Sequence, residues 1–429
     1  MKYDRIDNAL FIENRKHFVQ HLKPSSLAVF NANDIMPTNA DGSMPFRQNS
    51  DLFYLSGIDQ EESVLVICPQ ASKEELREVL FLKETSEEIA IWEGDKLTKE
   101  QAREVSGIQT VYWLDQFEVI FKQLMSECDL VYLNTNEHLR ANVVVETRDA
   151  RFINWVKDHY PLHSPERSAP IMHRIRSIKS QAEIDLIQKA CDITEKGFRR
   201  LLSYVKPGVM EYEIQAELSH EFLRNRSRGF AYEPIIASGF NSCVLHYVDN
   251  NKECKDGDIL LLDIGAEYAN YASDLTRCIP VNGRFTDRQK EVYNAVHHVQ
   301  KEAIKLLRPG TMLDDYHREV GKLMEAELLK LNLIDKTDIK NQNPNWPAYK
   351  KYFMHGTSHY MGLDVHDVGL WNIPIEKGMV FTCEPGIYIR EESLGIRIEN
   401  DIVVTGDTPL DFMRNIPSEI EEIEDLMNS

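Results

Sequence analysis

An internal repeat constrains the fold of this chain more than any other feature of its sequence. The segments VKPGVMEYEIQAEL (205–218) and LRPGTMLDDYHREV (307–320) lie 102 residues apart. Both read as the end of a helix, a basic residue, Pro-Gly, one further residue, Met, an acidic turn and a new helix. Proline and glycine stop a helix, and acidic residues favour the first turn of the next one. Such a matched pair predicts a duplicated fold with two related halves.

Each half then passes from helices into strands. The first half contains DGDILLLDIGAEY (256–268), and the second contains EKGMVFTCEPGIYI (376–389). In both, a turn with glycine precedes an apolar run that ends in a carboxylate, Asp263 in one and Glu384 in the other. Two related halves would bring these strand ends together across a pseudo-twofold axis. We therefore expect a metal or ligand site at the seam between the halves.

The chain before the repeat has a different pattern, which is typical of an α/β unit. Its periodicity predicts a helix over 11–23 and short strands over 63–68, 79–84 and 129–134. The stretch 159–173 contains three prolines and breaks the periodicity, so we expect it to connect two domains. The length of 429 residues also exceeds the size at which a single core stops growing.

Composition excludes several classes of partner. A net charge of −20 argues against a nucleic-acid-binding protein, since such a protein needs a basic face. The seven cysteines are an odd number without a CxxC pair, which favours reduced thiols over a disulfide framework. The sequence has no apolar stretch of membrane-spanning length and no apolar segment near its start that resembles a signal peptide. We expect a soluble cytoplasmic protein that binds neither nucleic acid nor a membrane.

Five residues form the candidate metal site: Asp263, Asp274, His359, Glu384 and Glu399. Taken singly, each has a structural interpretation, as a turn former, a hydrogen-bonded histidine or a solvent-facing strand residue. Together they place carboxylates repeatedly within or at the ends of apolar strands, and buried carboxylates must protonate or recruit cations. Four carboxylates and an imidazole suit Mn²⁺, Co²⁺, Fe²⁺ or Zn²⁺, and two divalent ions would balance the four negative charges.

Ordered motifs in the chain resemble those of the aminopeptidase P (Xaa-Pro aminopeptidase) family, within the creatinase/prolidase "pita-bread" superfamily. The motifs are DIGAEYANYASDLTR, HGTSHYMGLDVHDVG, EPGIYI and GIRIEN, with PFRQNSDLFYLSGIDQEESVLVI (45–67) and NSCVLHYVDN (241–250) before them. The resemblance covers nearly the whole chain. It implies an α/β (α+β) fold, with a creatinase-like N-terminal domain over 1–170 and a catalytic pita-bread domain with the internal duplication over 171–429.

The resemblance also implies a role for each candidate ligand. Asp263 would bind one metal ion, while His359 and Glu384 would bind the other. Asp274 and Glu399 would bridge the two ions, with Mn²⁺ the expected metal and Co²⁺ or Zn²⁺ the alternatives. A hydroxide between the ions would attack the peptide bond, and Glu384 would carry its proton to the leaving proline nitrogen.

Further residues match positions that contact the substrate. His366 is expected to stabilise the oxyanion, His246 to position the leaving side of the peptide, and His355 to close over the proline ring. Tyr388 and Arg397 match a hydrogen-bonding pair beside the metals. The expected substrates are therefore peptides that begin Xaa-Pro, from which the enzyme releases the first residue.

Other residues lie in the same segments without a matching role. Tyr360 and Met361 are candidates for an apolar wall of the proline pocket on position alone. We expect His297, His298 and His317, which lie in predicted helices, to be surface residues.

Two alternatives stay open at this point. A prolidase, which cuts only dipeptides ending in proline, has similar catalytic motifs, although the RQNS segment of the N-terminal part favours aminopeptidase P. A non-catalytic pita-bread binding protein would be expected to have lost metal ligands, and here all five are present. Relatives often assemble through their N-terminal domains, so we expect a homodimer or homotetramer. Trp92 is either a residue that reaches a neighbour's site or a core tryptophan.

Overall fold

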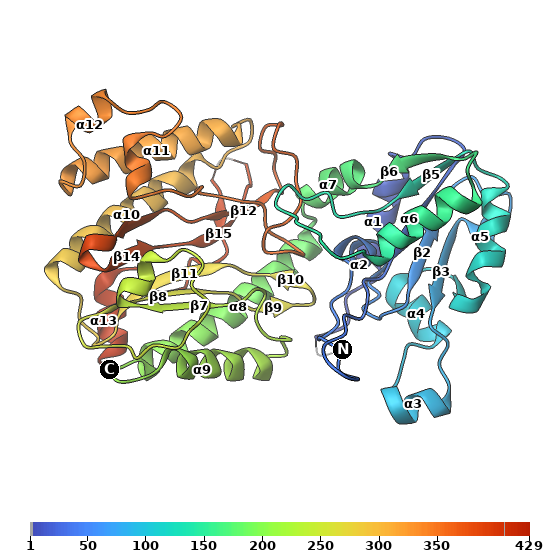
Figure 1. Ribbon diagram of the computed structural model, residues 1–429, viewed down its shortest axis with the longest axis horizontal. Helices are drawn as coiled ribbons and strands as arrows, with labels where there is room; N and C mark the ends of the chain where they lie inside the picture. Colours follow the sequence, from blue (N-terminus) through green and yellow to red (C-terminus); the bar gives the residue numbers. More distant parts are fainter. Residues whose placement is uncertain (1–2, 407) are drawn as a thin grey trace. The chain divides into compact units, whose positions relative to one another are not determined.

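The computed structural model describes residues 3–406 and 408–429 and divides the chain into two compact units (Figure 1). One unit comprises residues 4–176, and the other comprises residues 177–429 together with Tyr3. Among the residues that are described, no helix is both long and apolar enough to cross a membrane. All seven cysteines are free and buried.

The N-terminal unit is built on a six-stranded sheet in the order β4-β3-β2-β1-β5-β6. Its strands are β1 (Ser26–Asn31), β2 (Val64–Ile67), β3 (Glu78–Leu82), β4 (Thr110–Trp113), β5 (Leu130–Leu133) and β6 (Ser164–Arg167). Its helices are α1 (Ala9–Val19), α2 (Ser50–Ser56), α3 (Glu87–Glu93), α4 (Lys99–Ser106), α5 (Phe117–Met125), α6 (Arg148–His159) and most of α7 (Ala169–Ser177). Strands β1 and β2 are buried along their whole length, which explains their continuous apolar sequences.

The predicted helix and strands of this unit all form, with ends that differ by a few residues. The interpretation of 159–173 as a connecting segment is wrong. Its prolines accompany β6, which pairs with β5 at the edge of the sheet, and the stretch then enters α7. An edge strand tolerates proline because one of its sides donates no hydrogen bonds to a neighbouring strand.

The second unit contains the two related helix pairs that the repeat predicts. They are α8 (Gln181–Tyr204) with α9 (Glu211–Arg224), and α10 (Asp287–Leu306) with α11 (Leu313–Lys330). Gly208 and Gly310 follow the first helix of each pair and have φ angles of 95° and 89°, values that glycine adopts without strain. The two turns share a pair of hydrogen bonds. Gly208 N donates to Cys254 O, Gly310 N donates to Ile375 O, and each acceptor residue donates back to the residue after the glycine. This common geometry supports a true duplication.

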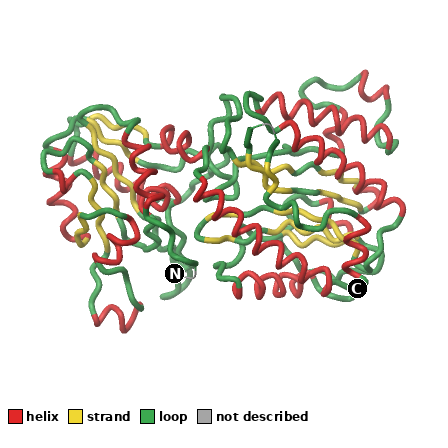
Figure 2. The backbone as a smooth tube through the Cα atoms, turned by 180° about the vertical axis from the view of Figure 1, so that it is seen from behind, coloured by secondary structure: helices red, strands yellow, loops and turns green. Residues whose placement is uncertain are grey.

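The strands of this unit lie between the α8–α9 pair and the α10–α11 pair (Figures 1 and 2). One sheet has the order β11-β8-β7 and another the order β12-β15-β16, with two further ribbons, β9-β10 and β13-β14. Their bounds are β7 (Ile235–Ser238), β8 (Ile259–Ile264), β9 (Glu267–Tyr268), β10 (Tyr271–Ala272), β11 (Leu275–Pro280), β12 (Val380–Cys383), β13 (Gly386–Ile389), β14 (Leu394–Arg397), β15 (Asn400–Val403) and β16 (Leu410–Asp411). Helices α12 (Lys336–Lys340) and α13 (Ile420–Met427) complete the unit.

Candidate metal centre

The four candidate carboxylates occupy equivalent places in two antiparallel strand pairs. Asp263 lies near the end of β8, and Asp274 immediately precedes the returning strand β11. Glu384 directly follows β12, and Glu399 immediately precedes the returning strand β15. A β-bridge between Thr276 and Glu399 joins the two halves at this point. The duplication therefore brings one outgoing and one returning carboxylate from each half to the seam.

His359 completes the cluster from the segment before β12. Ligand atoms of Asp274, His359 and Glu399 all lie within 4.8 Å of one another, and the three residues are buried. His359 Nε2 lies 3.5 Å from Asp274 Oδ2 and 3.8 Å from Glu384 Oε1. His359 Nδ1 lies 3.0 Å from the carbonyl oxygen of Tyr360 and must carry the proton to donate to it. The lone pair of Nε2 is thereby directed at the carboxylates, as in a metal-ligating histidine.

A directional chain of hydrogen bonds runs beside this cluster. Arg397 donates through Nη2 to Asp263 Oδ2 at 2.6 Å and through Nη1 to the Tyr388 hydroxyl at 2.8 Å. The Tyr388 hydroxyl lies 2.8 Å from His355 Nε2, and His355 Nδ1 lies 2.7 Å from Gly356 O. Burial, more than the nearby Arg397, lowers the pKa of His355 to about 3. A neutral His355 donates from Nδ1 and accepts the Tyr388 proton at Nε2, so every member of the chain is satisfied.

The charge in this cluster fits divalent cations. Burial, and then the neighbouring carboxylates, raise the pKa values of Asp274 and Glu399 well above the usual range. Burial raises the pKa of Glu384 to about 7 as well. Arg397 supplies one positive charge against four carboxylates, which cannot all ionise in a buried site without further cations. Carboxylate oxygens and an imidazole nitrogen are ligands for Mn²⁺, Co²⁺ or Zn²⁺, so the donor set also fits.

Three residues that support the ligands were missed in the sequence. The Tyr232 hydroxyl lies 2.6 Å from Oδ1 of both Asp263 and Asp274. Thr276 Oγ1 donates to Glu399 Oε2 at 2.6 Å, and Asp401 Oδ2 accepts from the backbone N–H of Asp274 at 2.9 Å.

Strand alternation could have identified two of these residues. Thr276 and Asp401 stand two residues after Asp274 and Glu399 respectively, so each shares a face with a ligand. Tyr232 lies in a loop before β7 and carries no such signal.

Two of the three predicted substrate-contacting histidines are exposed, and the third is largely buried. His246 lies in a loop after residues 239–243, and His366 lies between residues 361 and 370, which form neither helix nor strand. The His366 ring stands edge-on to the His359 ring with centroids 4.4 Å apart. His246 is near enough to His355 to disfavour its protonation. These side chains therefore border the carboxylate cluster, with His366 and His246 open to solvent.

Several expectations about neighbouring residues are wrong. Tyr360 and Met361 are fully buried, and the Tyr360 ring packs on Phe381, so neither forms an exposed pocket wall. His297 is also buried, because it lies on the inward face of α10. His317 is partly buried and accepts a hydrogen bond from the backbone N–H of Thr357, within the ligand-bearing segment.

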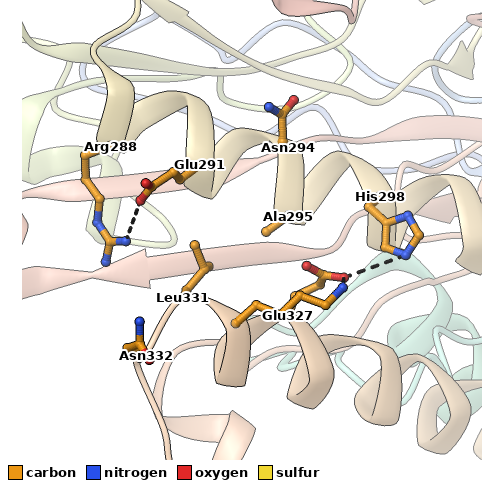
Figure 3. Close-up of a pocket in the computed structure, with 9 residues that line it drawn as sticks. Arg288, Glu291, Asn294, Ala295, His298, Glu327, Leu331 and Asn332 are labelled. Carbon is orange, nitrogen blue, oxygen red and sulfur yellow. Dashed lines mark hydrogen bonds and ion pairs between the residues drawn. The ribbon is translucent and has the colours of Figure 1, made fainter.

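A separate surface pocket of about 460 Å³ lies between α10 and α11 (Figure 3). Its charged groups pair with one another. Arg288 contacts Glu291 at 3.1 Å, and His298 contacts Glu327 at 3.7 Å. None of the five candidate ligands lines it. The carboxylate cluster remains the candidate centre.

Comparisons with known proteins agree with this architecture. Residues 11–132 match the family described as "Aminopeptidase P, N-terminal domain", and residues 185–406 match "Metallopeptidase family M24". The chain is 35% identical to the Xaa-Pro aminopeptidase of Escherichia coli and 32% identical to that of Haemophilus influenzae, covering 97% of both chains in each case. It is 32% identical to human Xaa-Pro aminopeptidase 3 over 89% of this chain and 76% of the human one.

Solved structures give the same result. The zinc-substituted Escherichia coli aminopeptidase P in complex with product superposes with a TM-score of 0.87 at 35% identity, over 99% of both chains. The Pseudomonas aeruginosa aminopeptidase PepP gives a TM-score of 0.89 at 31% identity, over 99% of this chain and 98% of that one. The predicted two-domain pita-bread fold is confirmed. The chain belongs to the aminopeptidase P family, with an M24 metallopeptidase domain behind an aminopeptidase P N-terminal domain.

Proposed function

We propose that this protein is a Xaa-Pro aminopeptidase, a metallo-exopeptidase that releases the first residue of peptides with proline at the second position. Its relatives with that name align over 97% of both chains. The observation that carries the proposal is the cluster at the seam of the duplicated fold, in which Asp274, His359 and Glu399 are buried together and the partly buried Asp263 and Glu384 lie beside them. Clustered carboxylates repel one another unless they are protonated or bind cations, and two divalent ions would balance four negative charges.

The proposed ligands divide between two divalent ions. Asp263 would hold one ion, His359 and Glu384 would hold the other, and Asp274 and Glu399 would bridge the pair. When bound, two such ions lower the pKa of water and polarise the scissile carbonyl. Mn²⁺ is the proposed native metal. A relative from Escherichia coli has been solved with zinc substituted, which shows that the family site accepts Zn²⁺ in that protein.

The side chains of this unit would supply the remaining chemistry. Glu384 is fixed through its backbone N–H, which donates to Thr357 O at 2.8 Å, so its carboxylate can take a proton from water and pass it to the departing nitrogen. That transfer matters because a ring amine leaves poorly unless it is protonated. Exposed His366 would donate a hydrogen bond to the oxyanion, an effect of about 3–4 kcal/mol in comparable sites.

The other two histidines would bind the peptide. His246 would contact the leaving side of the substrate. His355 would close over the proline ring, since it is held from behind by Tyr388 and packs edge-on against the Phe353 ring at 4.9 Å. Because His355 is neutral, its ring presents an apolar face rather than a charge to the proline.

A peptide panel tests this function directly. The proposal predicts cleavage of Xaa-Pro-Xaa tripeptides and longer peptides, with little cleavage of the matched Xaa-Ala-Xaa peptides, by protein loaded in turn with Mn²⁺, Co²⁺ and Zn²⁺. A prolidase would cleave Xaa-Pro dipeptides and leave the tripeptides intact. A non-catalytic binding protein would cleave none of them with any metal. The matched N-terminal domain supports the aminopeptidase over prolidase.

We also propose that the protein is a homodimer or homotetramer. Trp92 lies on α3 and is 84% exposed, beside Ile91 at 78%. Burying this apolar surface against a neighbouring copy would stabilise an assembly. Light scattering after size exclusion should give a mass of two or four chains, and Trp92→Ala should slow cleavage of long peptides more than of tripeptides. A fully active monomer at micromolar concentration would refute this part.

A further inference from the structure

A buried ion pair holds the segment that carries His366. Lys179 Nζ lies 3.0 Å from Asp367 Oδ2, and both side chains are only 1% exposed. Asp367 is the residue next to His366, whereas Lys179 stands 188 residues earlier, immediately before the N-cap of α8. A buried charge is tolerated only when it is paired and hydrogen-bonded. A fully buried ion pair therefore lies one residue from His366, the proposed oxyanion-stabilising group.

Individual contacts, and not a helix or strand, hold the segment that carries His366. Residues 361–370 form neither helix nor strand. Asp367 anchors the segment in three ways. Its backbone N–H donates to Tyr360 O at 2.9 Å, its Oδ1 accepts from the N–H of Val368 at 2.9 Å, and its Oδ2 meets Lys179. The anchored Asp367 therefore fixes the backbone from which the His366 ring extends toward the His359 ring, 4.4 Å away between centroids.

The lysine end of the pair is itself rigid. The backbone N–H of Lys179 donates to Gly378 O at 2.8 Å, and Ile178 forms a β-bridge with Met379, directly before β12. Ser180, the next residue, caps α8 with a reciprocal capping box to Glu183. Lys179 is therefore fixed to the strand that leads to Glu384, so the pair couples the His366 segment to the ligand-bearing strand.

A glycine leaves room for this contact. A Cβ atom on Gly362 would lie 2.3 Å from Asp367 Oδ2 and 2.8 Å from Lys179 Cε. Gly362 also accepts a hydrogen bond from the N–H of Ala272 at 2.8 Å, so the backbone there cannot withdraw freely. Any side chain at residue 362 would displace the ion pair.

We propose that Lys179 and Asp367 are positioning residues, which hold His366 where it can donate to the oxyanion. This inference rests on the proposed function of His366. Both side chains are buried, so a positioning role requires no contact with the substrate. Losing the pair should therefore lower kcat through His366 while leaving KM and the metal content close to the wild-type values.

A double-mutant cycle tests the inference. Asp367→Asn keeps the shape and the contact with Val368 but breaks the ion pair, and it should lower kcat by up to about 100-fold. In a His366→Ala background the same substitution should change kcat by no more than about twofold, because the group it positions is gone. Metal content by mass spectrometry should stay unchanged in all four proteins.

A second variant tests the same inference in case Asp367→Asn does not fold. Gly362→Ala keeps both Lys179 and Asp367 but displaces their side chains. It should also lower kcat, and it should have no effect on kcat in the His366→Ala background. A matched control is Glu424→Gln on α13, which disturbs a largely buried carboxylate held by Phe285 N–H, Lys290 and Arg284. This control should leave kcat unchanged.

The outcomes separate the inference from the function on which it rests. An equal loss of kcat from Asp367→Asn in both backgrounds, or a loss of bound metal, would overturn the positioning role and leave the proposed function intact. A His366→Ala protein with full kcat would overturn the role of His366 itself. A loss in Asp367→Asn and Gly362→Ala that disappears without His366 supports the inference.

Discussion

Removing the Tyr232 hydroxyl should weaken metal binding without removing any proposed ligand. This hydroxyl lies 2.6 Å from Oδ1 of both Asp263 and Asp274. Burial and the two aspartates raise the pKa of Tyr232 well above its usual range, so it remains an O–H donor at every working pH. The hydroxyl lies between a carboxylate that would hold one ion and a carboxylate that would bridge both, and its proton is donated to one of the two oxygens at a time. Tyr232→Phe abolishes this hydrogen bond while keeping the ring.

The magnitude follows from the charge on the acceptor. A hydrogen bond to a charged group contributes about 1.5–3 kcal/mol, which corresponds to roughly 10- to 150-fold in a binding constant. Losses of 10- to 100-fold are also typical when a residue that orients a metal ligand is changed. We therefore expect the Mn²⁺ concentration for half-maximal activity to rise by about one to two orders of magnitude in Tyr232→Phe. Saturating Mn²⁺ should restore most of kcat.

The assay is activity on a Xaa-Pro tripeptide across a metal-buffered Mn²⁺ series. Tyr293→Phe is the matched control, because it removes another buried tyrosine hydroxyl, one that donates to Ser418 O at 2.8 Å from the inward face of α10. The control should lose some thermal stability and keep wild-type metal affinity. An unchanged Mn²⁺ midpoint in Tyr232→Phe would refute the view that this hydroxyl organises the aspartates.

Three histidine variants should give three distinct signatures in steady-state kinetics and metal analysis. His366→Ala should lower kcat by about 100- to 1,000-fold with little change in KM. His355→Ala should act mainly on KM and on discrimination between proline and alanine at the second position, and His359→Ala should lose bound metal. Equal losses of activity in all three variants, with the metal retained, would show that the roles in this segment are misassigned. A third prediction concerns Asp149, whose pKa is raised by burial from 3.8 to about 7. Its contribution to stability is therefore full below about pH 4 and is lost as the pH rises through about 7. In Asp149→Asn the Asn31 side chain can still donate to the new amide oxygen. The free energy of unfolding in urea should therefore rise for this variant relative to wild type as the pH increases across that range. A difference that does not change with pH would contradict the prediction.

Much of the fold and of the site can be predicted from the internal repeat in the sequence. Pro-Gly turns after α8 and α10, and carboxylates at strand ends, follow from local rules that the sequence displays directly. The prediction of a linker over 159–173 was wrong, because a proline on an edge strand and a proline in a linker have the same local sequence pattern until the neighbouring strand is known. The prediction that His297 is a surface residue was wrong for a related reason, since its burial depends on which face of the helix packs against the sheet.

The support around the ligands was harder to predict than the ligands. Tyr232 comes from a loop 31 residues before Asp263, and no periodic pattern joins the two. The Lys179–Asp367 pair spans 188 residues, and its two members look like ordinary surface charges in the sequence. Contacts of this kind are set by tertiary packing, which a single sequence does not reveal.

Counting metal ions tests the central claim most directly. After dialysis with Mn²⁺, mass spectrometry should find about two ions per wild-type chain, and chelation should abolish activity while circular dichroism still shows most of the folded signal. Asp274→Asn and Glu399→Gln, which each remove one proposed bridging charge, should bind at least one ion fewer and lose nearly all activity. Wild-type metal content and full activity in either variant would contradict the account.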